Sequence, residues 1–342
     1  PNLQQTQSID RKKGYFEVGS KVNESWDDVI LQGPHFTVAN PFAKQPNPTM
    51  KNNLDWTELD LEALPADFIP RTSYQPVGNP LEYEKAYPET SYSGKKREQF
   101  RLAWRRMASV TGQRTLHATV IPPGTSHLFT LRSVSSEIED QSRTLELLGI
   151  FSSIPSDYFV KTSAVADLTE SFIKCLPMAQ EHLLAPDLIL RAARLICLTE
   201  TYRCLWESTI REPWSPAKTY RNSGSRRAAL VEIDALVALM FGLNADELCT
   251  IYRTQFPVLR GYELNDLYDS NGRKVPGEIN KLYRQRGETL SVDERTWTHP
   301  QSKVEYVFEF PFQSFDREED MRKAYTHFEQ LLADKQAEEL VK

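Results

Sequence analysis

Proline and asparagine recur so often in the first 92 residues that a long helix cannot form there. Residues 31–49 (LQGPHFTVANPFAKQPNPT) and 63–80 (ALPADFIPRTSYQPVGNP) carry a proline every few positions, and each proline fixes φ and removes a backbone donor. Short β-like runs at 15–18 and 35–39 lie between these turn signals. The sequence therefore predicts a loop-rich segment with short strands over residues 1–92.

The pattern changes after this segment. Apolar residues recur at helical spacing and Gly112 can end a helix, which predicts an amphipathic helix over residues 96–110. Residues 115–121 (TLHATVI) alternate like a strand, and residues 127–134, after a PPGTS turn, are expected to be its hairpin partner. Another helix is expected over residues 138–151. The apolar positions of the first helix are Phe100, Ala103, Trp104 and Met107.

Helical patterns dominate the remainder of the chain. Pro186 can occupy the first turn of a long helix that we expect to end near Ile210. A second helix is expected over residues 226–241, with Gly242 as its cap. Asn244 has a glutamate three residues later, which is the spacing of a capping box at the start of a further helix.

A charged amphipathic helix is expected from Asp316 onward. Together these patterns predict an α+β fold, in which a helix–hairpin recognition unit with a small mixed sheet precedes a helical C-terminal part. We expect three segments: a loop-rich segment over 1–92, a target-recognition core over 93–215 and a helical part over 216–342.

Composition limits the classes of protein to which the chain can belong. With 342 residues, 40% of them hydrophobic, it can bury a substantial core. No apolar run is long enough to span a membrane, and the formal net charge of −6 excludes a globally basic nucleic-acid coat. The first residue is Pro1 and no signal sequence follows, so we expect a piece of a longer chain. The four cysteines favour reduced thiols in a cytoplasmic protein, because none lies in a CxxC pair; they are Cys175, Cys197, Cys204 and Cys249.

The strongest catalytic candidate is the string VANPFAKQPNP, which contains Asn40-Pro41-Phe42. Amino-directed DNA methyltransferases carry a D/N-P-P-Y/F motif that holds the target amino group and stacks on the flipped base. Here one proline is missing and no glycine-rich turn precedes the string, so a surface loop is the favoured interpretation. No metal, phosphate-loop or nucleophile spacing occurs elsewhere, and we expect no catalytic residue, cofactor or metal in this chain.

Positive charge interleaved with aromatic residues is the other prominent feature. In the predicted helix Arg97, Arg101 and Arg105 fall four residues apart and should form one basic stripe. Such residues can neutralise DNA phosphates, but they can equally pair with the many Asp and Glu residues, and composition alone favours the second interpretation. The basic segments are residues 95–114, 211–227 and 273–286.

Residues 102–124 (LAWRRMASVTGQRTLHATVIPPG) resemble part of a known family. It is the family of large fused restriction-modification adenine methylases, which includes type IIG enzymes and the methylases of the BREX and DISARM phage-defence systems. The family pattern is W/F-R-(D)-I-A-x-x-T-(N/D)-x-R-T-x-I-A-(A)-x-I-P. The matching residues are Trp104, Arg105, Ala108, Thr111, Arg114, Thr115, Ala118, Ile121 and Pro122.

Two later stretches resemble the same family. Residues 151–178 match at Asp157 and Tyr158, and residues 230–259 contain the family's IDA string around Asp234. The departures from the pattern are Gly112, Lys161 and Phe241.

The resemblance implies a C-terminal target-recognition region whose catalytic domain, with its S-adenosylmethionine pocket, lies upstream of Pro1. The expected partners are double-stranded DNA and that upstream domain, with other subunits of the defence system as further candidates, and no membrane. Alternatively, the chain is a protein-interaction or structural module anchored by Trp26 and Trp56, and a stand-alone hydrolase ranks below both. The DNA contacts that we expect are Lys95, Lys96, Arg97, Arg101, Arg105, Arg106, Arg114, Arg132, Arg226 and Arg227.

Overall fold

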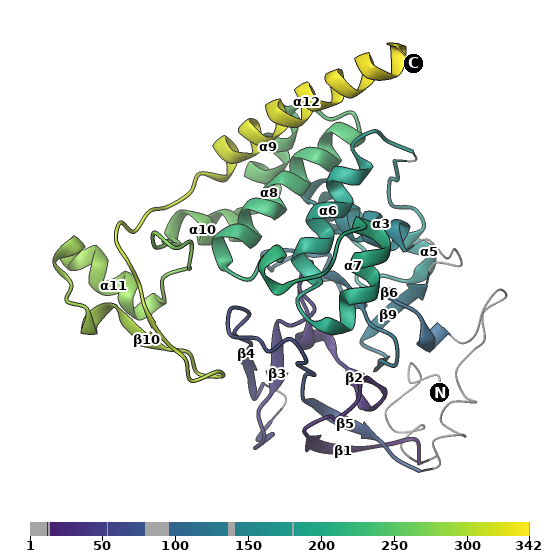
Figure 1. Ribbon diagram of the computed structural model, residues 1–342, viewed down its shortest axis with the longest axis vertical. Helices are drawn as coiled ribbons and strands as arrows, with labels where there is room; N and C mark the ends of the chain where they lie inside the picture. Colours follow the sequence, from purple (N-terminus) through teal and green to yellow (C-terminus); the bar gives the residue numbers. More distant parts are fainter. Residues whose placement is uncertain are drawn as a thin grey trace.

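The computed structural model describes residues 12, 14–52, 54–78, 96–135, 141–179 and 181–341. The fold is α+β, as predicted: small and mostly antiparallel sheets precede a mainly helical C-terminal region (Figure 1). One hydrophobic cluster runs from Ala39 to Phe328 and includes residues of all three predicted segments. The boundaries at 92/93 and 215/216 therefore do not separate independent cores.

The N-terminal segment has the short strands and many turns that its prolines predict. Strand β1 (Phe16–Lys21) pairs antiparallel with β5 (Thr72–Pro76), and β3 (Lys44–Pro46) pairs with β4 (Trp56–Glu58). Two short 3₁₀ helices complete the segment: η1 (Trp26–Asp28) and η2 (Gly33–His35). The expected strand over 35–39 does not form, because His35 belongs to η2 and Thr37 makes only an isolated bridge to Asn40.

The second sheet region is a three-stranded sheet. Strand β6 (Arg101–Arg105) lies between β7 (Ala118–Ile121) and β9 (Leu131–Ser135), and both pairings are antiparallel. The first part of the predicted hairpin is confirmed as β7, but β7 does not pair with β9 because β6 separates them. The short strands β2 (Ile30–Leu31) and β8 (Ser126–His127) pair in parallel beside this sheet.

The helix predicted over residues 96–110 is wrong. Within residues 96–110, the only helical element is the short 3₁₀ helix η3 (Lys96–Glu98), and the strand β6 follows it. The chain is extended because both faces of β6 are covered: Leu102 and Trp104 pack into the main core, whereas Ala103 packs against a cluster from the N-terminal segment. Sequence spacing of about three to four residues could not distinguish this doubly buried strand from one face of a helix.

Ten α-helices of the described chain follow or pack on this sheet. They are α3 (Ser142–Ser152), α4 (Ile154–Thr162), α5 (Glu170–Ile173), α6 (Ala185–Ile196), α7 (Arg203–Ile210), α8 (Ser223–Met240), α9 (Ala245–Gln255), α10 (Pro257–Asn265), α11 (Gly277–Arg286) and α12 (Arg317–Val341). Short 3₁₀ helices lie between them: η4 (Glu200–Tyr202), η5 (Pro216–Lys218), η6 (Gly287–Thr289) and η7 (Asp293–Arg295). Near the C-terminus, β10 (Thr296–Thr298) pairs with β11 (Glu305–Val307).

Several helix predictions are confirmed and one is corrected. Helix α8 ends before Gly242, which has a φ of 73°, and Asn244 forms the predicted capping box with Glu247. The single helix expected after Pro186 is instead divided into α6 and α7. The helix is interrupted at Cys197. The carbonyl oxygen of this residue accepts a hydrogen bond from Trp214 Nε1 and not from the backbone N–H of a following helical turn.

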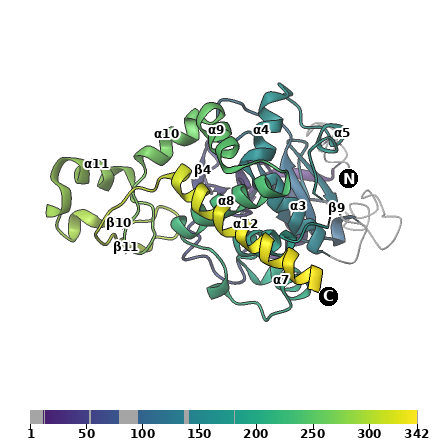
Figure 2. The same ribbon diagram turned by 90° about the horizontal axis from the view of Figure 1, so that it is seen from above.

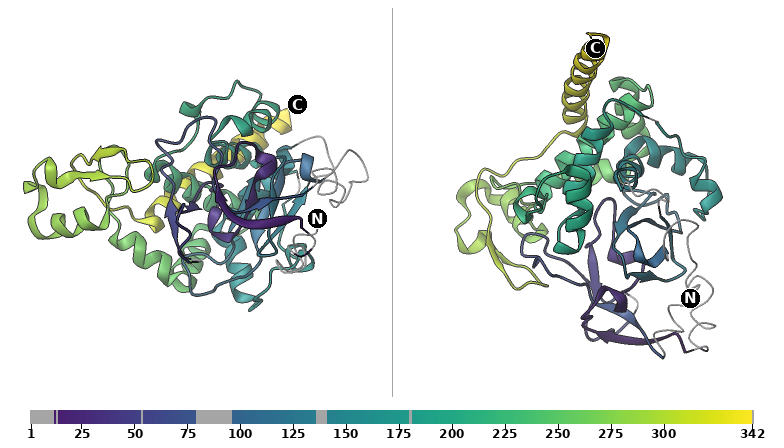
Figure 3. Two further views of the ribbon diagram at one scale, coloured as in Figure 1. Left: turned by 90° about the horizontal axis from the view of Figure 1, so that it is seen from below. Right: turned by 45° about the vertical axis from the view of Figure 1, so that its right-hand side comes forward.

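Helix α12 lies along α8 and contacts α9, and its C-terminal end projects beyond the rest of the molecule (Figure 3). The core contains Cys197 and Cys249, whereas Cys175 and Cys204 are exposed. Across the described ranges, no helix combines the length and the apolar character that crossing a bilayer requires.

Candidate nucleic-acid interface

Three arginines of the first basic segment donate to backbone carbonyl groups of the protein. Arg97 donates to the carbonyl of Asp27, Arg101 to that of Thr125, and Arg105 to that of Phe36. Arg97 and Arg101 are each 4% exposed, and burial lowers the pKa of Arg105 to about 10. Arg97 and Arg105 thus join this part of the chain to residues 27–36, whereas Arg101 bonds the turn that precedes β8.

Arg114 forms the most deeply buried ion pair of the sheet. Its Nε lies 2.5 Å from Asp157, which is fully buried at the start of α4. The same carboxylate accepts the backbone N–H groups of Thr115 and Leu116 at 2.9–3.1 Å. Two backbone N–H groups and a guanidinium therefore share one carboxylate, which fixes the chain as it enters β7.

Arg106 and Arg132 lie closer to the surface but also have protein partners. Arg106 forms a two-point ion pair with Asp167, and its guanidinium lies 3.7 Å from the centre of the Phe129 ring. This pairing raises the pKa of Arg106 and lowers the pKa of Asp167. Arg132 lies 3.8 Å from Glu170.

The arginines predicted in the second basic segment are also internal. Arg226 donates to the carbonyls of Leu195, Tyr220 and Ala39 at 2.7–2.8 Å, and burial lowers its pKa to about 9. Arg227 is 8% exposed. Its partners are Glu263 at 2.6 Å and Asp320 at 2.7 Å.

The basic stripe expected on a helix is therefore not formed. Arg97, Arg101, Arg114 and Arg227 are each less than one-tenth exposed, so they cannot reach a DNA phosphate in this conformation. Arg105, Arg106, Arg132 and Arg226 are likewise engaged with carbonyl or carboxylate oxygens. Lys95 lies outside the described residues, and Lys96 begins η3.

Buried histidines accompany these arginines and are neutral. Burial, together with the charges of Arg105 and Arg114, lowers the pKa of His117 to about 3. Burial also lowers the pKa of His35 and of His127 to about 4. All three lie in or beside the sheets, and none has the exposure or the charge of a phosphate ligand.

A different set of cations faces solvent. We call Lys161, Arg260, Lys281 and Arg284 the cation row, because α4, α9 and α10 lie side by side along one edge of the molecule with α11 beyond them (Figure 2). Arg260, Lys281 and Arg284 are exposed and Lys161 is partly exposed. None of the four forms an ion pair with a carboxylate in the described part of the chain.

Two contacts place Lys161 and Arg284 beside opposite ends of α10. Lys161 Nζ lies 4.9 Å from the centre of the Phe256 ring, which immediately precedes α10. At the other end of α10, Arg284 donates to the carbonyl of Asn265 at 3.1 Å. Lys161 therefore lies near the start of α10, and Arg284 lies near its end.

Exposed apolar side chains lie among these cations. On α10, Val258 is 36% exposed, Tyr262 50% and Leu264 67%. Lys274 Nζ lies 5.9 Å from the Tyr262 ring and 2.6 Å from Asp266. Cations interleaved with aromatic and apolar side chains are typical of surfaces that bind nucleic acid.

The sequence indicates only part of this surface. Lys281 and Arg284 belong to the third basic segment and were visible as a local cluster. Lys161 on α4 and Arg260 on α10 are single cations in their stretches of sequence, and the packing of both helices against α9 brings them to one part of the molecule. No local sequence signal could have identified these two.

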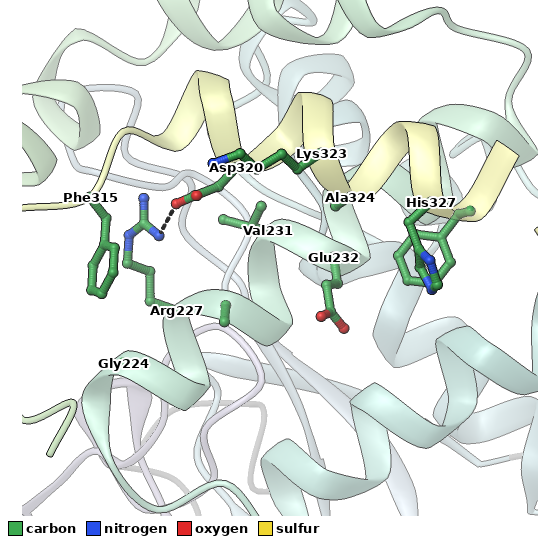
Figure 4. Close-up of a pocket in the computed structure, with 11 residues that line it drawn as sticks. Gly224, Arg227, Val231, Glu232, Phe315, Asp320, Lys323, Ala324 and His327 are labelled. Carbon is green, nitrogen blue, oxygen red and sulfur yellow. Dashed lines mark hydrogen bonds and ion pairs between the residues drawn. The ribbon is translucent and has the colours of Figure 1, made fainter. Parts of the chain in front are cut away.

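The cavities of the described structure do not form a recognisable catalytic centre. One groove of about 310 Å³ lies between α8 and α12, where Arg227 and Asp320 are bonded at one end and His327 lies at the other (Figure 4). A second groove of about 500 Å³ is bordered by Glu62, Arg273 and Trp297. Among the described residues, no group of three or more His, Cys, Asp or Glu side chains is placed to hold a metal ion.

Comparisons of the chain with protein-family models, with curated proteins and with solved structures found no match.

Proposed function

We propose that this chain is the double-stranded DNA recognition portion of an adenine-N6-specific DNA methyltransferase of a restriction-modification or phage-defence system. The upstream part of the same protein would bind S-adenosylmethionine and perform the methyl transfer. Such a protein acts in the cytoplasm, where its DNA partner lies. The observation that carries the proposal is the cation row, whose four charges have no carboxylate partner among the described residues.

The placement of the pattern residues supports the resemblance. Arg114 and Thr115 come from one resembling stretch and Asp157 from another, and they bond to one another in the core. Asp234, from the third stretch, accepts the N–H of Ile154 at 2.7 Å and pairs with Arg317. Residues matched at distant positions thus form one connected polar framework, which is what a pattern set by a common fold would produce.

The positive charge on the surface supports DNA as the ligand of this chain. A duplex presents a regular line of phosphates, and neutralising several of them releases counterions. The cation row offers unpaired charges along adjoining helices, whereas the sheet arginines are saturated with internal partners. Binding should therefore depend on α4, α10 and α11 and not on β6.

The test is binding of a fluorescent duplex at several salt concentrations. We expect weak binding by the unmodified chain, with log K falling linearly with log salt. Changing Arg260→Glu together with Arg284→Glu should lower affinity about tenfold or more and reduce the salt slope.

A matched control is available on other surfaces. Lys51 and Arg211 are exposed and, like the row, form no ion pair with described residues. Lys51→Glu combined with Arg211→Glu changes the net charge by the same amount and should leave affinity within about twofold. Equal losses in the two double variants, or no salt-dependent binding by the unmodified chain, would contradict the proposal.

The alternative function is docking onto a protein. The exposed Val258, Tyr262 and Leu264 favour it, since exposed apolar side chains on one helix also suit a protein partner. The two tryptophans predicted as anchors do not favour docking, because both have partners within the chain. Trp26 packs against the core, and the Trp56 ring lies 4.7 Å from the His35 ring. A partner pulled down by the chain in high salt, without any DNA binding, would favour docking.

A further inference from the structure

We infer that the loop between β6 and β7, residues 106–113, is the segment that recognises DNA bases. This inference rests on the proposed function. It assigns sequence discrimination to a site that is distinct from the phosphate-binding cation row. It is carried by the exposure of the loop, its anchoring and the chemistry of its side chains.

The loop differs in exposure from everything beside it. Arg101–Trp104 before it and Arg114–Leu116 after it are buried, whereas most of the loop is exposed. Met107 is 61% exposed and Val110 is 47% exposed. Holding apolar side chains in water is unfavourable unless a partner covers them, so their exposure indicates a contact surface.

Ion pairs fix both ends of the loop. At its start, Arg106 pairs with Asp167, and the backbone of Ala108 bonds to Ala166 at 3.0 Å. Immediately after the loop, Arg114 pairs with the fully buried Asp157. A short segment held at both ends loses little conformational entropy on binding, and a rigid scaffold that presents an exposed loop is the usual arrangement of a recognition site.

The exposed side chains have the chemistry of base recognition. Ser109, Thr111 and Gln113 are uncharged hydrogen-bonding residues, and the hydroxyls of Ser109 and Thr111 lie 3.2 Å apart. An amide can bond adenine at two points, hydroxyls can bond either kind of base edge, and apolar groups contact the thymine methyl. Arg106 contributes little net charge because Asp167 neutralises it, so the loop discriminates between bases without adding general affinity.

The position of the loop fits one occupant, a DNA duplex lying on the cation row. Met107 forms a bridge with Asp167, which follows helix α4, and α4 carries Lys161 at the near end of the row. At the base of the loop, Arg106 also contacts Phe129, which is 42% exposed. A major groove roughly 12 Å wide accommodates a protruding segment of this kind while phosphates contact the neighbouring cations.

The experiment is selection of bound duplexes from a randomised library, followed by affinity measurements on the selected and a scrambled duplex. The loop variant combines Thr111→Ala with Gln113→Ala. The matched control combines Thr326→Ala with Gln336→Ala, the same chemical changes at exposed positions of α12. Thermal unfolding of both variants establishes that they fold.

We expect the loop variant to lose about tenfold in discrimination between the two duplexes, while its affinity for the scrambled duplex and its salt slope stay unchanged. The control should select the same sequence as the unmodified chain. Unchanged discrimination in the loop variant, or a chain that binds all duplexes equally, would overturn the inference and leave DNA binding intact. A chain that binds no duplex would instead overturn the proposed function.

Discussion

Two groups of basic residues in this chain have opposite environments. The arginines around β6 are dense in sequence and buried in the fold, where they bond to carbonyl and carboxylate oxygens. The cation row is dispersed in sequence and lies on the surface without carboxylate partners among the residues described. The difference teaches that a local cluster of arginines need not mark a binding surface, because guanidinium groups also satisfy buried backbone carbonyls.

The sharpest test of the buried group is Asp157→Ala. It would leave Arg114 without its carboxylate and two backbone N–H groups without their acceptor, all in the core. Because an unpaired buried charge is costly, we expect the free energy of unfolding to fall by about 3–5 kcal/mol. Urea denaturation measures this loss, and a loss below about 1 kcal/mol would mean that the buried pair is not structural.

A smaller loss is expected from Arg105→Met, which removes the donor to the Phe36 carbonyl but keeps much of the side-chain volume. The carbonyl left unsatisfied should lower the free energy of unfolding by about 1–3 kcal/mol. DNA affinity, measured well below the melting temperature, should not change. Reduced DNA affinity with an unchanged free energy of unfolding would mean that Arg105 contacts DNA, and would contradict its internal role.

The sheets should also be more sensitive to acid than the helical region. His35 has a pKa of about 4 in the folded chain, against about 6.5 when unfolded, so the unfolded state binds more protons between these pH values. Stability conferred by the neutral histidine is complete above pH 6.5 and is lost as pH falls, by about 1–2 kcal/mol from pH 7 to pH 5.

The pKa values of His117 and His127 are shifted in the same direction and add to this effect. Denaturation curves at several pH values measure it, with His35→Gln as the variant whose slope against pH should be shallower by about one proton. A pH-independent unfolding free energy over this range would contradict the burial of these side chains.

The smallest effect on stability is expected in the cation row. Arg260→Ala and Arg284→Ala, both at exposed positions, should change the free energy of unfolding by less than about 0.5 kcal/mol each. Both should nevertheless weaken DNA binding. A larger loss in the free energy of unfolding for these variants than for Arg105→Met would contradict the contrast between an internal group and a surface group of cations.

The parts of the fold that could be predicted from the sequence are those whose structure is determined by neighbouring residues. Prolines in the N-terminal segment, the Asn244 capping box and the periodicity of α8 depend on neighbouring residues, and those predictions are confirmed. The prediction for the residues of β6 was wrong, because the residues that cover the two faces of this strand are far away in sequence. Its apolar spacing satisfied a helical template equally well.

The candidate site was less accessible to prediction for the same reason. Arg101 and Arg226 looked exposed because arginine usually is, but their partners are carbonyl oxygens of distant residues that carry no signal in sequence. Lys161 and Arg260 come together only through the packing of α4, α9 and α10. Trp104 and Arg114, which lie in the stretch that resembles a methylase family, are buried.

The most direct test of the central claim is a lysine-acetylation footprint of the chain, with and without a short DNA duplex. Lys161 and Lys281 lie in the cation row, whereas Lys44 and Lys51 lie on the N-terminal sheets and their connection. The account predicts that DNA protects Lys161 and Lys281 from modification and leaves Lys44 and Lys51 as reactive as before. Protection of Lys44 and Lys51 with Lys161 and Lys281 still reactive would contradict it.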